Sequence, residues 1–363
     1  MAETVHNNSW VFKKIPTELP ELGVHTTFED RPVSLTPPPG GVVVKLLVAG
    51  LDPHQRDRMR GPDFESYVPG YHLDETITNF AISKVIKSDN PDYKEGDLMQ
   101  GLLPVAEYGV IPKELIDIKP MASHLVWKVE NKYNLDYSHY MGPLGLAGMT
   151  AWNSFYGLVK PEKGKTIWVN AASSSVGELV VQLAKKEGMR VIASVSSADK
   201  LKYVVDELGA DAGFNYRDED ITAALKRLAP EGLDVVYDNV GGDHFQAAIE
   251  NLNWFGKIIV CGAASQYNKT KEEQYGVTNL SEIFRRRINI RGFIYWDHDI
   301  YEENIESFRE NMPKWLADGS IKARYSVHDG LETAPSAFLE MFTGKAFGKA
   351  VLKIADAEVL LQS

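Results

Sequence analysis

Short apolar runs separated by turn residues mark the first third of the chain. The run Val42–Val48 follows Pro37–Gly41, and the pairs Gly61-Pro62 and Pro69-Gly70 divide the segment after it. Apolar runs bounded by Gly and Pro in this way are typical of β strands joined by turns. Residues 1 to about 135 are therefore expected to form a β-rich, barrel-like unit.

Beyond Gly142 the pattern changes to apolar strands that alternate with amphipathic helical stretches. The predicted strands are Val169–Ala171, Val191–Val195, Gly213–Asn215, Val235–Tyr237, Ile258–Gly262 and Ile288–Tyr295. The helical stretches include Glu178–Glu187, Lys200–Leu208 and Ala223–Leu228. Such alternation predicts βαβ units and a parallel, doubly wound sheet, so the expected fold class is α/β.

The end of the chain consists of shorter elements. A helix is predicted near Glu302–Leu316, a short helix over Ala334–Phe342, and a strand at Ala350–Ile354. This tail can return to the first domain.

Composition places the chain among ordinary globular proteins. Its 363 residues exceed what one core usually supports, and the 44% apolar and 25% charged fractions are of common size. Because no segment approaches the roughly 18 consecutive apolar residues of a membrane helix, and the amino terminus lacks a secretory pattern, we expect a soluble, cytoplasmic protein. The net charge of −11 argues against a nucleic-acid partner.

The turn before the helical stretch Glu178–Glu187 carries the sharpest local signal. The chain from Trp168 to Leu179 reads as a buried strand, a turn of tiny residues and the start of a helix. Small side chains let the backbone approach a pyrophosphate, which a helix amino terminus stabilises. Gly177 is the one glycine kept from G-x-G-x-x-G, and Ser174 stands at its middle position. A plain tight turn with a serine cap is the alternative, but the second strand that follows favours a dinucleotide site.

The end of that second strand indicates which dinucleotide is bound. NAD sites usually place Asp or Glu there, whereas this chain has Ser194–Ser197 followed by Lys200. An acidic group would repel a 2′-phosphate, and a lysine attracts it. We therefore predict NADPH as the cofactor. In the alternative reading, Lys200 is an exposed lysine in a first helical turn.

Nine segments, in their order and spacing, resemble one known superfamily. They are LDPHQRDRMRG (from Leu51), DYKEGDLMQG (from Asp92), MGPLGLAGMTAW (from Met141), AASSSVGELVVQLAK (from Ala171), ELGADAGFNYRD (from Glu207), DVVYDNVGG (from Asp234), CGAASQYNKT (from Cys261), NIRGFIYW (from Asn289) and GKAVLKI (from Gly348). Together they resemble the medium-chain dehydrogenase/reductase superfamily, and within it the zinc-free prostaglandin and leukotriene reductases and the plant alkenal double-bond reductases.

The resemblance implies two domains and a homodimer. Residues 1–138 and 311–363 would form a GroES-like, β-rich catalytic domain, and residues 139–310 a Rossmann domain that binds NADPH, with substrate between them. Zinc-dependent members use Cys and His ligands and a cysteine-rich lobe, which the single cysteine, Cys261, cannot supply. We therefore expect a zinc-independent protein without a metal site.

The resemblance also assigns residues to the cofactor. Lys200 and Tyr216 would hold the 2′-phosphate, and Asn239 and Gly241 would lie near the ribose and pyrophosphate. In the alternative reading, Tyr216 and Phe293 are core aromatics and Asn239–Gly242 is a turn. The full set of expected cofactor residues is Thr150, Ser174, Val176, Gly177, Ser196, Lys200, Tyr216, Asn239, Gly241, Cys261, Gly262, Phe293, Ala346 and Gly348.

Three residues are expected in the substrate pocket, namely His54, Phe80 and Tyr295. The relatives that the chain resembles have an aromatic residue at position 54, a tyrosine at 80 and often an asparagine at 346, where this chain has His54, Phe80 and Ala346. We expect these departures to reshape the pocket and to remove one polar contact to the cofactor.

Tyr267 is the candidate catalytic residue. Reduction of an activated alkene needs hydride at the β-carbon, stabilisation of the charge that moves onto the carbonyl oxygen, and later a proton at the α-carbon. Without zinc, a hydrogen-bond donor such as Tyr267 must stabilise that oxygen, unless this tyrosine only packs on a neighbour. The sequence therefore predicts an NADPH-dependent reductase of carbon–carbon double bonds conjugated to a carbonyl. A quinone reductase, an enoyl reductase of a biosynthetic pathway and a catalytically decayed NADPH-binding regulator stay open as alternatives.

Overall fold

The structure is a computed structural model that describes residues 4–61, 63–118 and 125–355. Its chain divides into two compact units. The first unit comprises the residues up to Gly145 together with those from Tyr325, and the second comprises Leu146–Arg324. Helix α9 (His298–Ala317) lies whole in the second unit, so the domain limit that the sequence placed at residue 310 falls inside this helix.

Within the described residues, the second unit contains a sheet of six parallel strands in the order β12-β11-β10-β13-β14-β15. They are β10 (Thr166–Val169), β11 (Arg190–Val195), β12 (Ala212–Asn215), β13 (Leu233–Asp238), β14 (Leu252–Val260) and β15 (Asn289–Gly292). The strand order reverses between β10 and β13, as in a doubly wound Rossmann sheet, and ligands of such sheets bind at the carboxyl ends of the strands beside the reversal. The predicted parallel, doubly wound sheet is confirmed.

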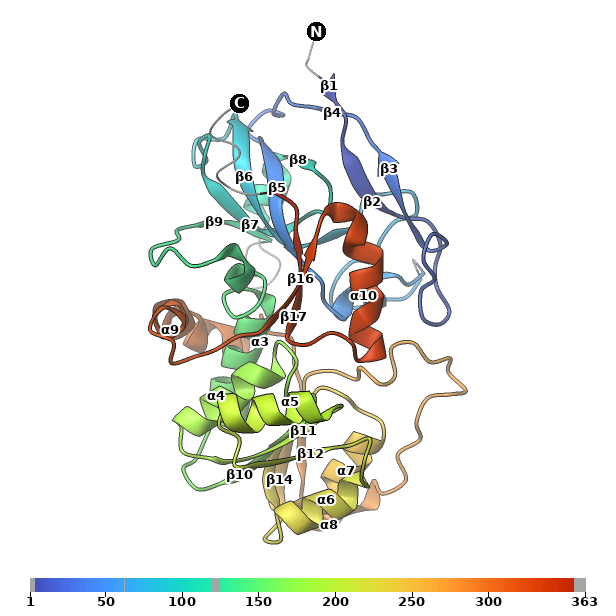
Figure 1. Cartoon of the computed structure of the whole chain (residues 1–363), viewed down its shortest axis with the longest axis vertical. Helices are drawn as coiled ribbons and strands as arrows, with labels where there is room; N and C mark the ends of the chain where they lie inside the picture. The colour runs from blue at the N-terminus through green and yellow to red at the C-terminus, as the bar shows by residue number, and fades with distance from the viewer. Residues whose placement is uncertain (1–3, 62, 119–124, 356–363) are drawn as a thin grey trace. The chain divides into compact units, whose positions relative to one another are not determined.

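Helices cover both faces of this sheet. They are α3 (Leu146–Ser154) with the π turn η2 (Phe155–Val159), α4 (Gly177–Lys186), α5 (Ala198–Lys202) with the π turn η3 (Tyr203–Glu207), α6 (Ile221–Leu228), α7 (Asp243–Asn251), α8 (Ser281–Arg286) and α9. Figure 1 shows α4 and α5 on one side of β10–β12 and α6 on the other. On the side of α6 and α7, fully buried Trp168, Leu225 and Ile249 belong to one core.

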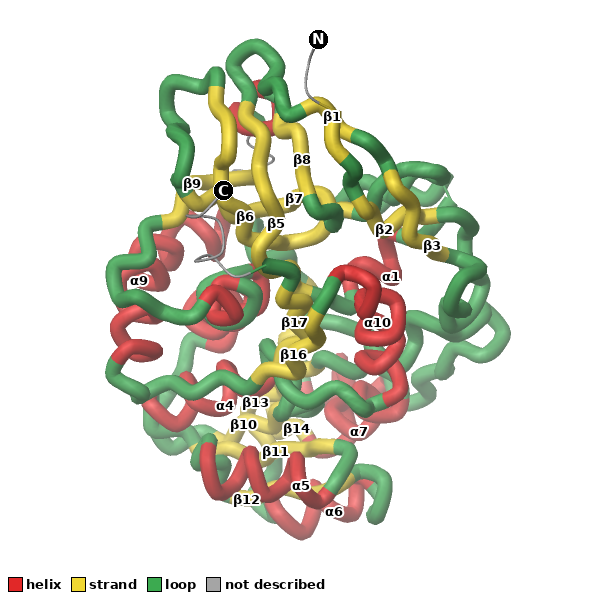
Figure 2. The backbone as a smooth tube through the Cα atoms, turned by 45° about the horizontal axis from the view of Figure 1, so that its top comes forward, coloured by secondary structure: helices red, strands yellow, loops and turns green. Residues whose placement is uncertain are grey.

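The first unit is built around the long apolar strand β5 (Val42–Gly50), which pairs with β6, β8 and β17. Its other strands are β1 (Thr4–Val5), β2 (Asn8–Phe12), β3 (Thr26–Asp30), β4 (Val33–Ser34), β6 (Thr78–Ser88), β7 (Leu98–Pro104), β8 (Tyr108–Ile111), β9 (Val126–Val129), β16 (Tyr325–Asp329) and β17 (Lys349–Lys353). Its short helices are α1 (His54–Arg58), α2 (Lys113–Asp117), η1 (Tyr137–Tyr140), η4 (Leu331–Thr333) and α10 (Ala334–Thr343). Strands dominate this unit, as the sequence predicted (Figure 2).

The carboxyl-terminal segment belongs to the first unit. Strand β17 pairs antiparallel with β5, with Val351 opposite Gly50, and β16 lies parallel beside β17 (Figure 2). Helix α10 places Phe338 edge-on against Trp10, with ring centroids 6.0 Å apart. The predicted return of the tail is therefore confirmed. Among the described residues, no helix combines the length and the apolar character needed to cross a membrane.

Candidate functional site

The turn between β10 and α4 brings backbone unusually close to backbone. Ala171 has a φ of +44°, and a Cβ on Gly177 would lie 2.3 Å from the Ala171 carbonyl oxygen, so only glycine fits there. Ser174 Oγ accepts a hydrogen bond from the Gly177 N–H at 3.1 Å, and Val176 at the N-cap supplies no side-chain cap. The turn therefore shows the serine-bonded helix start of one reading, since the Glu178 N–H also donates to the Ser174 carbonyl at 2.9 Å. The other reading depends on the partial positive charge of the helix amino terminus, which attracts a pyrophosphate.

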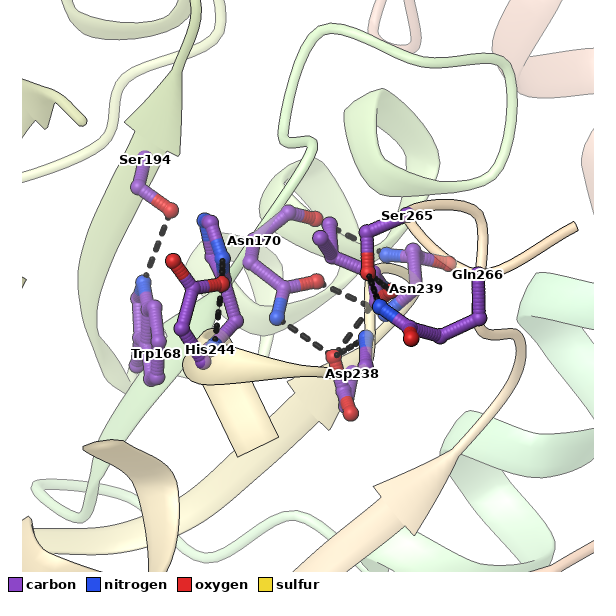
Figure 3. A network of polar contacts seen from close by, with 11 residues as sticks. Trp168, Asn170, Ser194, Asp238, Asn239, His244, Ser265 and Gln266 are labelled. Atoms are coloured by element: carbon purple, nitrogen blue, oxygen red, sulfur yellow. Dashed lines mark hydrogen bonds and ion pairs between the residues drawn. The ribbon is translucent and has the colours of Figure 1, made fainter. Parts of the chain in front are cut away.

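A polar network joins the carboxyl ends of β10 and β13, where the strand order reverses (Figure 3). Asp238, fully buried, accepts from Asn170 Nδ2 at 2.6 Å and from the N–H groups of Val240 and Gly241 at 3.0 Å each, all on Oδ1. Asn239 in turn donates its N–H to Asn170 Oδ1 at 2.7 Å and its side-chain amide to the Asn170 carbonyl at 2.9 Å. These bonds fix the turn Asn239–Gly242 relative to the neighbouring strand.

A positively charged corner lies at the ends of β11 and β12. Val195 pairs with Asn215, and the Tyr216 N–H donates to the Val195 carbonyl at 3.1 Å, which places Tyr216 next to the strand end that leads into Ser196. Lys200, on α5, is 9% exposed, and burial together with the nearby charge of Arg217 lowers the pKa of its ammonium group. Two cations that raise each other's electrostatic energy are stabilised by an anion between them, so this corner fits a 2′-phosphate. Arg217 was not among the residues predicted for this site.

Tyr267 lies in the loop after β14 and is held against the backbone of that loop. Its Oη accepts the Ala263 N–H at 3.1 Å, and a Cβ on Gly262 would lie 2.9 Å from that oxygen. The Gly262 and Cys261 N–H groups donate to the Asp238 carbonyl at 3.1 and 2.8 Å, so the loop is tied to β13 as well. A phenol that accepts an N–H keeps an O–H with which it can donate, which is the role predicted for Tyr267.

The remaining cofactor candidates of the second unit are placed as follows. Burial raises the pKa of the Cys261 thiol to about 12, so this side chain is uncharged at physiological pH. Thr150 is half-buried on α3, and Phe293 is half-buried just after β15. Tyr295 is buried, and its carbonyl accepts the Asn153 amide at 2.9 Å, so its backbone position is fixed by α3.

In the first unit, His54 and Phe80 are in contact. Their rings meet edge-on with centroids 6.4 Å apart, and Phe80 also lies 6.3 Å from Trp127. Burial lowers the pKa of His54 to about 4, so the imidazole is neutral at physiological pH. Its Nδ1 is buried without a hydrogen-bond partner among the described residues. Ala346 and Gly348 lie just before β17.

A buried ion pair lies beside His54. Lys349 donates to the carboxylate of Asp52 and to the Leu51 carbonyl, the latter at 3.0 Å, and both charged side chains are buried. Asn79 Nδ2 donates to Asp52 Oδ2 at 3.1 Å. Although burial acts to raise it, the charge of Lys349 holds the pKa of Asp52 below its ordinary value. None of these polar residues was predicted as a site residue from the sequence.

The chain matches two protein-family models and many known proteins. Residues 8–117 match the N-terminal domain of oxidoreductases, and residues 175–310 match a family described as zinc-binding dehydrogenase. Dehydrogenase FUB6 of Gibberella moniliformis is 71% identical over 356 residues, which cover 98% of this chain and 100% of that protein. The chain belongs to the medium-chain dehydrogenase/reductase family. Within this family, the 2-alkenal reductase (NADP(+)-dependent) of Nicotiana tabacum is 35% identical, over 98% of this chain and 99% of that protein.

A solved member of the family supports the cofactor. The crystal structure of CurA in complex with NADPH, from Vibrio vulnificus, superposes with a TM-score of 0.86 at 28% identity, and covers 96% of this chain and 99% of that one. The chain is an NADPH-dependent oxidoreductase with a Rossmann unit and a GroES-like, β-rich unit, which confirms the predicted fold class and cofactor. Among the described residues, no group of three or more His, Cys, Asp or Glu side chains is arranged to hold a metal ion.

Proposed function

We propose that this oxidoreductase reduces carbon–carbon double bonds conjugated to a carbonyl, with enals and enones as substrates. NADPH, when bound, supplies the hydride for the β-carbon. Tyr267 donates a hydrogen bond to the carbonyl oxygen as negative charge develops there, which lowers the energy of the enolate. The observation that supports this role is the 3.1 Å hydrogen bond from the Ala263 N–H to Tyr267 Oη. This bond fixes the oxygen in a loop at the carboxyl end of the sheet, where ligands of such folds bind. The phenol keeps its hydroxyl proton because it is the acceptor in this bond.

We propose the following cofactor contacts. The turn with Ser174, Val176 and Gly177 binds the pyrophosphate at the amino terminus of α4, where a Cβ at Gly177 has no room. The positive corner with Ser196, Lys200 and Tyr216 binds the 2′-phosphate. The other proposed contacts are Thr150, Asn239, Gly241, Cys261, Gly262, Phe293, Ala346 and Gly348.

His54, Phe80 and Tyr295 are proposed to contact the substrate. The neutral imidazole of His54 against the Phe80 ring offers an apolar aromatic surface with one polar edge. Such a surface suits an uncharged, conjugated carbonyl compound better than a charged one, since a buried charge would need a partner. The prostaglandin, leukotriene and alkenal reductases named above are the branch of the family that this proposal favours.

Oxidation of NADPH, followed by its absorbance with a panel of compounds, tests the function. We expect the highest kcat/KM with α,β-unsaturated aldehydes or ketones and no turnover of saturated aldehydes. A preference for quinones would identify a quinone reductase, and a preference for enoyl thioesters an enoyl reductase of a biosynthetic pathway. Tight NADPH binding without oxidation by any of these compounds would identify a decayed, regulatory protein.

We further propose a homodimer in the cytoplasm. Within the described residues, β15 is an edge strand of its sheet. Trp254 and Phe255 on the neighbouring strand β14 and Phe284 on α8 are 65%, 67% and 70% exposed. Large exposed aromatic side chains beside a sheet edge are typical of surfaces that bind another protein chain. Light scattering on the purified chain should give twice the mass of one chain, and the mass of a single chain would contradict the proposal.

A further inference from the structure

A buried carboxyl group lies in the first turn of helix α4. Glu178 is the second residue of this helix and is 1% exposed. Its Oε2 accepts from the Tyr203 hydroxyl at 2.9 Å, and the Arg324 N–H approaches its two oxygens at 3.4 and 3.3 Å. The carboxyl group therefore turns away from the turn that precedes α4 and contacts η3 and the last residue of the second unit.

The segment that Glu178 contacts is also held one turn further along α4. Gln182 donates its amide to the Lys322 carbonyl at 2.8 Å and accepts the Lys322 N–H at 2.7 Å. Arg324 ends the second unit, and the chain then continues into β16. Any rearrangement at Glu178 consequently acts on the start of α4 and on this connecting segment at once.

The groups that face Glu178 come from η3 and from the connecting segment. They are the Tyr203 hydroxyl, the backbone N–H of Arg324, and the Arg324 guanidinium, which lies 5.5 Å over the Tyr203 ring. The charge of Glu207 acts on Tyr203 from the same element. Burial raises the pKa of Glu178 to about 8, against the smaller opposing effects of Tyr203 and Arg324. The group is therefore mostly neutral at pH 7 and ionises just above it.

We propose that Glu178 is a positioning residue that links NADPH binding to its own protonation. The pyrophosphate binds at the amino terminus of α4 while Glu178 is neutral, and ionisation of Glu178 weakens this binding. The partial positive charge of a helix amino terminus stabilises nearby anions. A carboxylate in the first turn of the same helix competes for that charge and repels the phosphates. The inference rests on the proposed place of the pyrophosphate and is independent of the alkene chemistry.

The dissociation constant of NADPH between about pH 6.5 and 9.5 tests the proposal. Glu178→Gln mimics the neutral carboxyl, and Glu187→Gln, at the exposed carboxyl end of α4, is the matched control. At the acid end all three proteins should bind alike. Above about pH 8 the wild type and Glu187→Gln should lose up to about tenfold in affinity per pH unit relative to Glu178→Gln. The test is the ratio of the wild-type dissociation constant to that of Glu178→Gln, in which titration of Lys200 cancels. A ratio that stays constant with pH overturns the proposal.

Two measurements keep the test independent of how well Glu178→Gln folds. Calorimetry at about pH 8, in two buffers of different ionisation enthalpy, should show uptake of about half a proton when NADPH binds the wild type, and no uptake overturns the proposal. Tyr203→Phe removes a donor to the carboxylate, which should move the pH dependence to higher pH. Failure of the wild type to bind NADPH at pH 7 would refute the cofactor site itself, whereas binding with a constant ratio refutes only the proton linkage.

Discussion

Replacing Tyr267 with phenylalanine separates the two roles of its hydroxyl. The first role is structural, because Oη accepts the Ala263 N–H at 3.1 Å. An N–H that loses its acceptor inside a protein costs about 1–3 kcal/mol. Both residues are half-buried, so water can partly replace the lost partner, and we expect a loss in stability of about 1 kcal/mol for Tyr267→Phe.

The second role is catalytic and should be the larger effect. Loss of one donor to a developing oxyanion typically lowers kcat by about 10-fold to 1000-fold. A ribose hydroxyl of the cofactor can share that oxygen, so we expect the lower part of this range. KM should change less than kcat, because the donor acts mainly in the transition state. The affinity for NADPH should be nearly unchanged.

Steady-state kinetics on the best enal or enone, beside thermal unfolding, measure both effects. Tyr275→Phe is the matched control, since Tyr275 is 40% exposed and lies further along the same loop. The control should leave both kcat and stability within error of the wild type. If Tyr267→Phe loses stability but keeps full turnover, Tyr267 is a packing residue and the enolate is stabilised by another group.

Three further outcomes are expected. Lys200→Ala should weaken NADPH binding by about 1–3 kcal/mol and change NADH binding little, as dissociation constants would show, and equal affinity of the wild type for both cofactors would contradict the 2′-phosphate site. Activity should survive exhaustive chelation, and one mole of zinc per mole of purified protein would contradict the zinc-free reaction. The raised pKa of Glu178 contributes stability that is fully present below about pH 4.5 and is lost as the pH rises through about 8. In denaturant titrations, the free energy of unfolding should therefore fall in this window by up to about 1.4 kcal/mol per pH unit. Glu178→Gln should lack this decrease.

The second unit could be predicted from the sequence because its buried parallel strands are continuous apolar runs. The limits of some elements could not, because they depend on individual hydrogen bonds. Strand β15 ends at Gly292, before the predicted Tyr295, since the Ile294 N–H and carbonyl bond Asp297 in a turn. Helix α6 begins at Ile221, two residues before the predicted start, because Asp220 caps it by accepting the Ala223 N–H at 2.8 Å.

The candidate site was predictable only in part, for a related reason. Turn composition and family resemblance point to residues such as Gly177 and Tyr267, which follow the predicted strands by a few residues. The side chains that hold those loops leave no local pattern. Asp238 bonds Asn170 from 68 residues away, and Lys349 bonds Asp52 from 297 residues away. Only the folded chain shows that these polar residues meet.

The buried pair of Asp52 and Lys349 permits a last test of how the first unit holds its candidate substrate residues. The two side chains are 5% and 2% exposed, so removal of either partner leaves an uncompensated buried charge. Lys349→Met and Asp52→Asn should each cost about 3–5 kcal/mol of unfolding free energy. The double variant should be far more stable than the sum of the two losses predicts, because it buries no charge, and the amide introduced by Asp52→Asn would still offer an oxygen to Asn79. Urea titrations of the four proteins measure the coupling. Strictly additive losses would show that Asp52 and Lys349 are each stabilised by other groups, and the first residues of α1, including His54, would then be held in place without this ion pair.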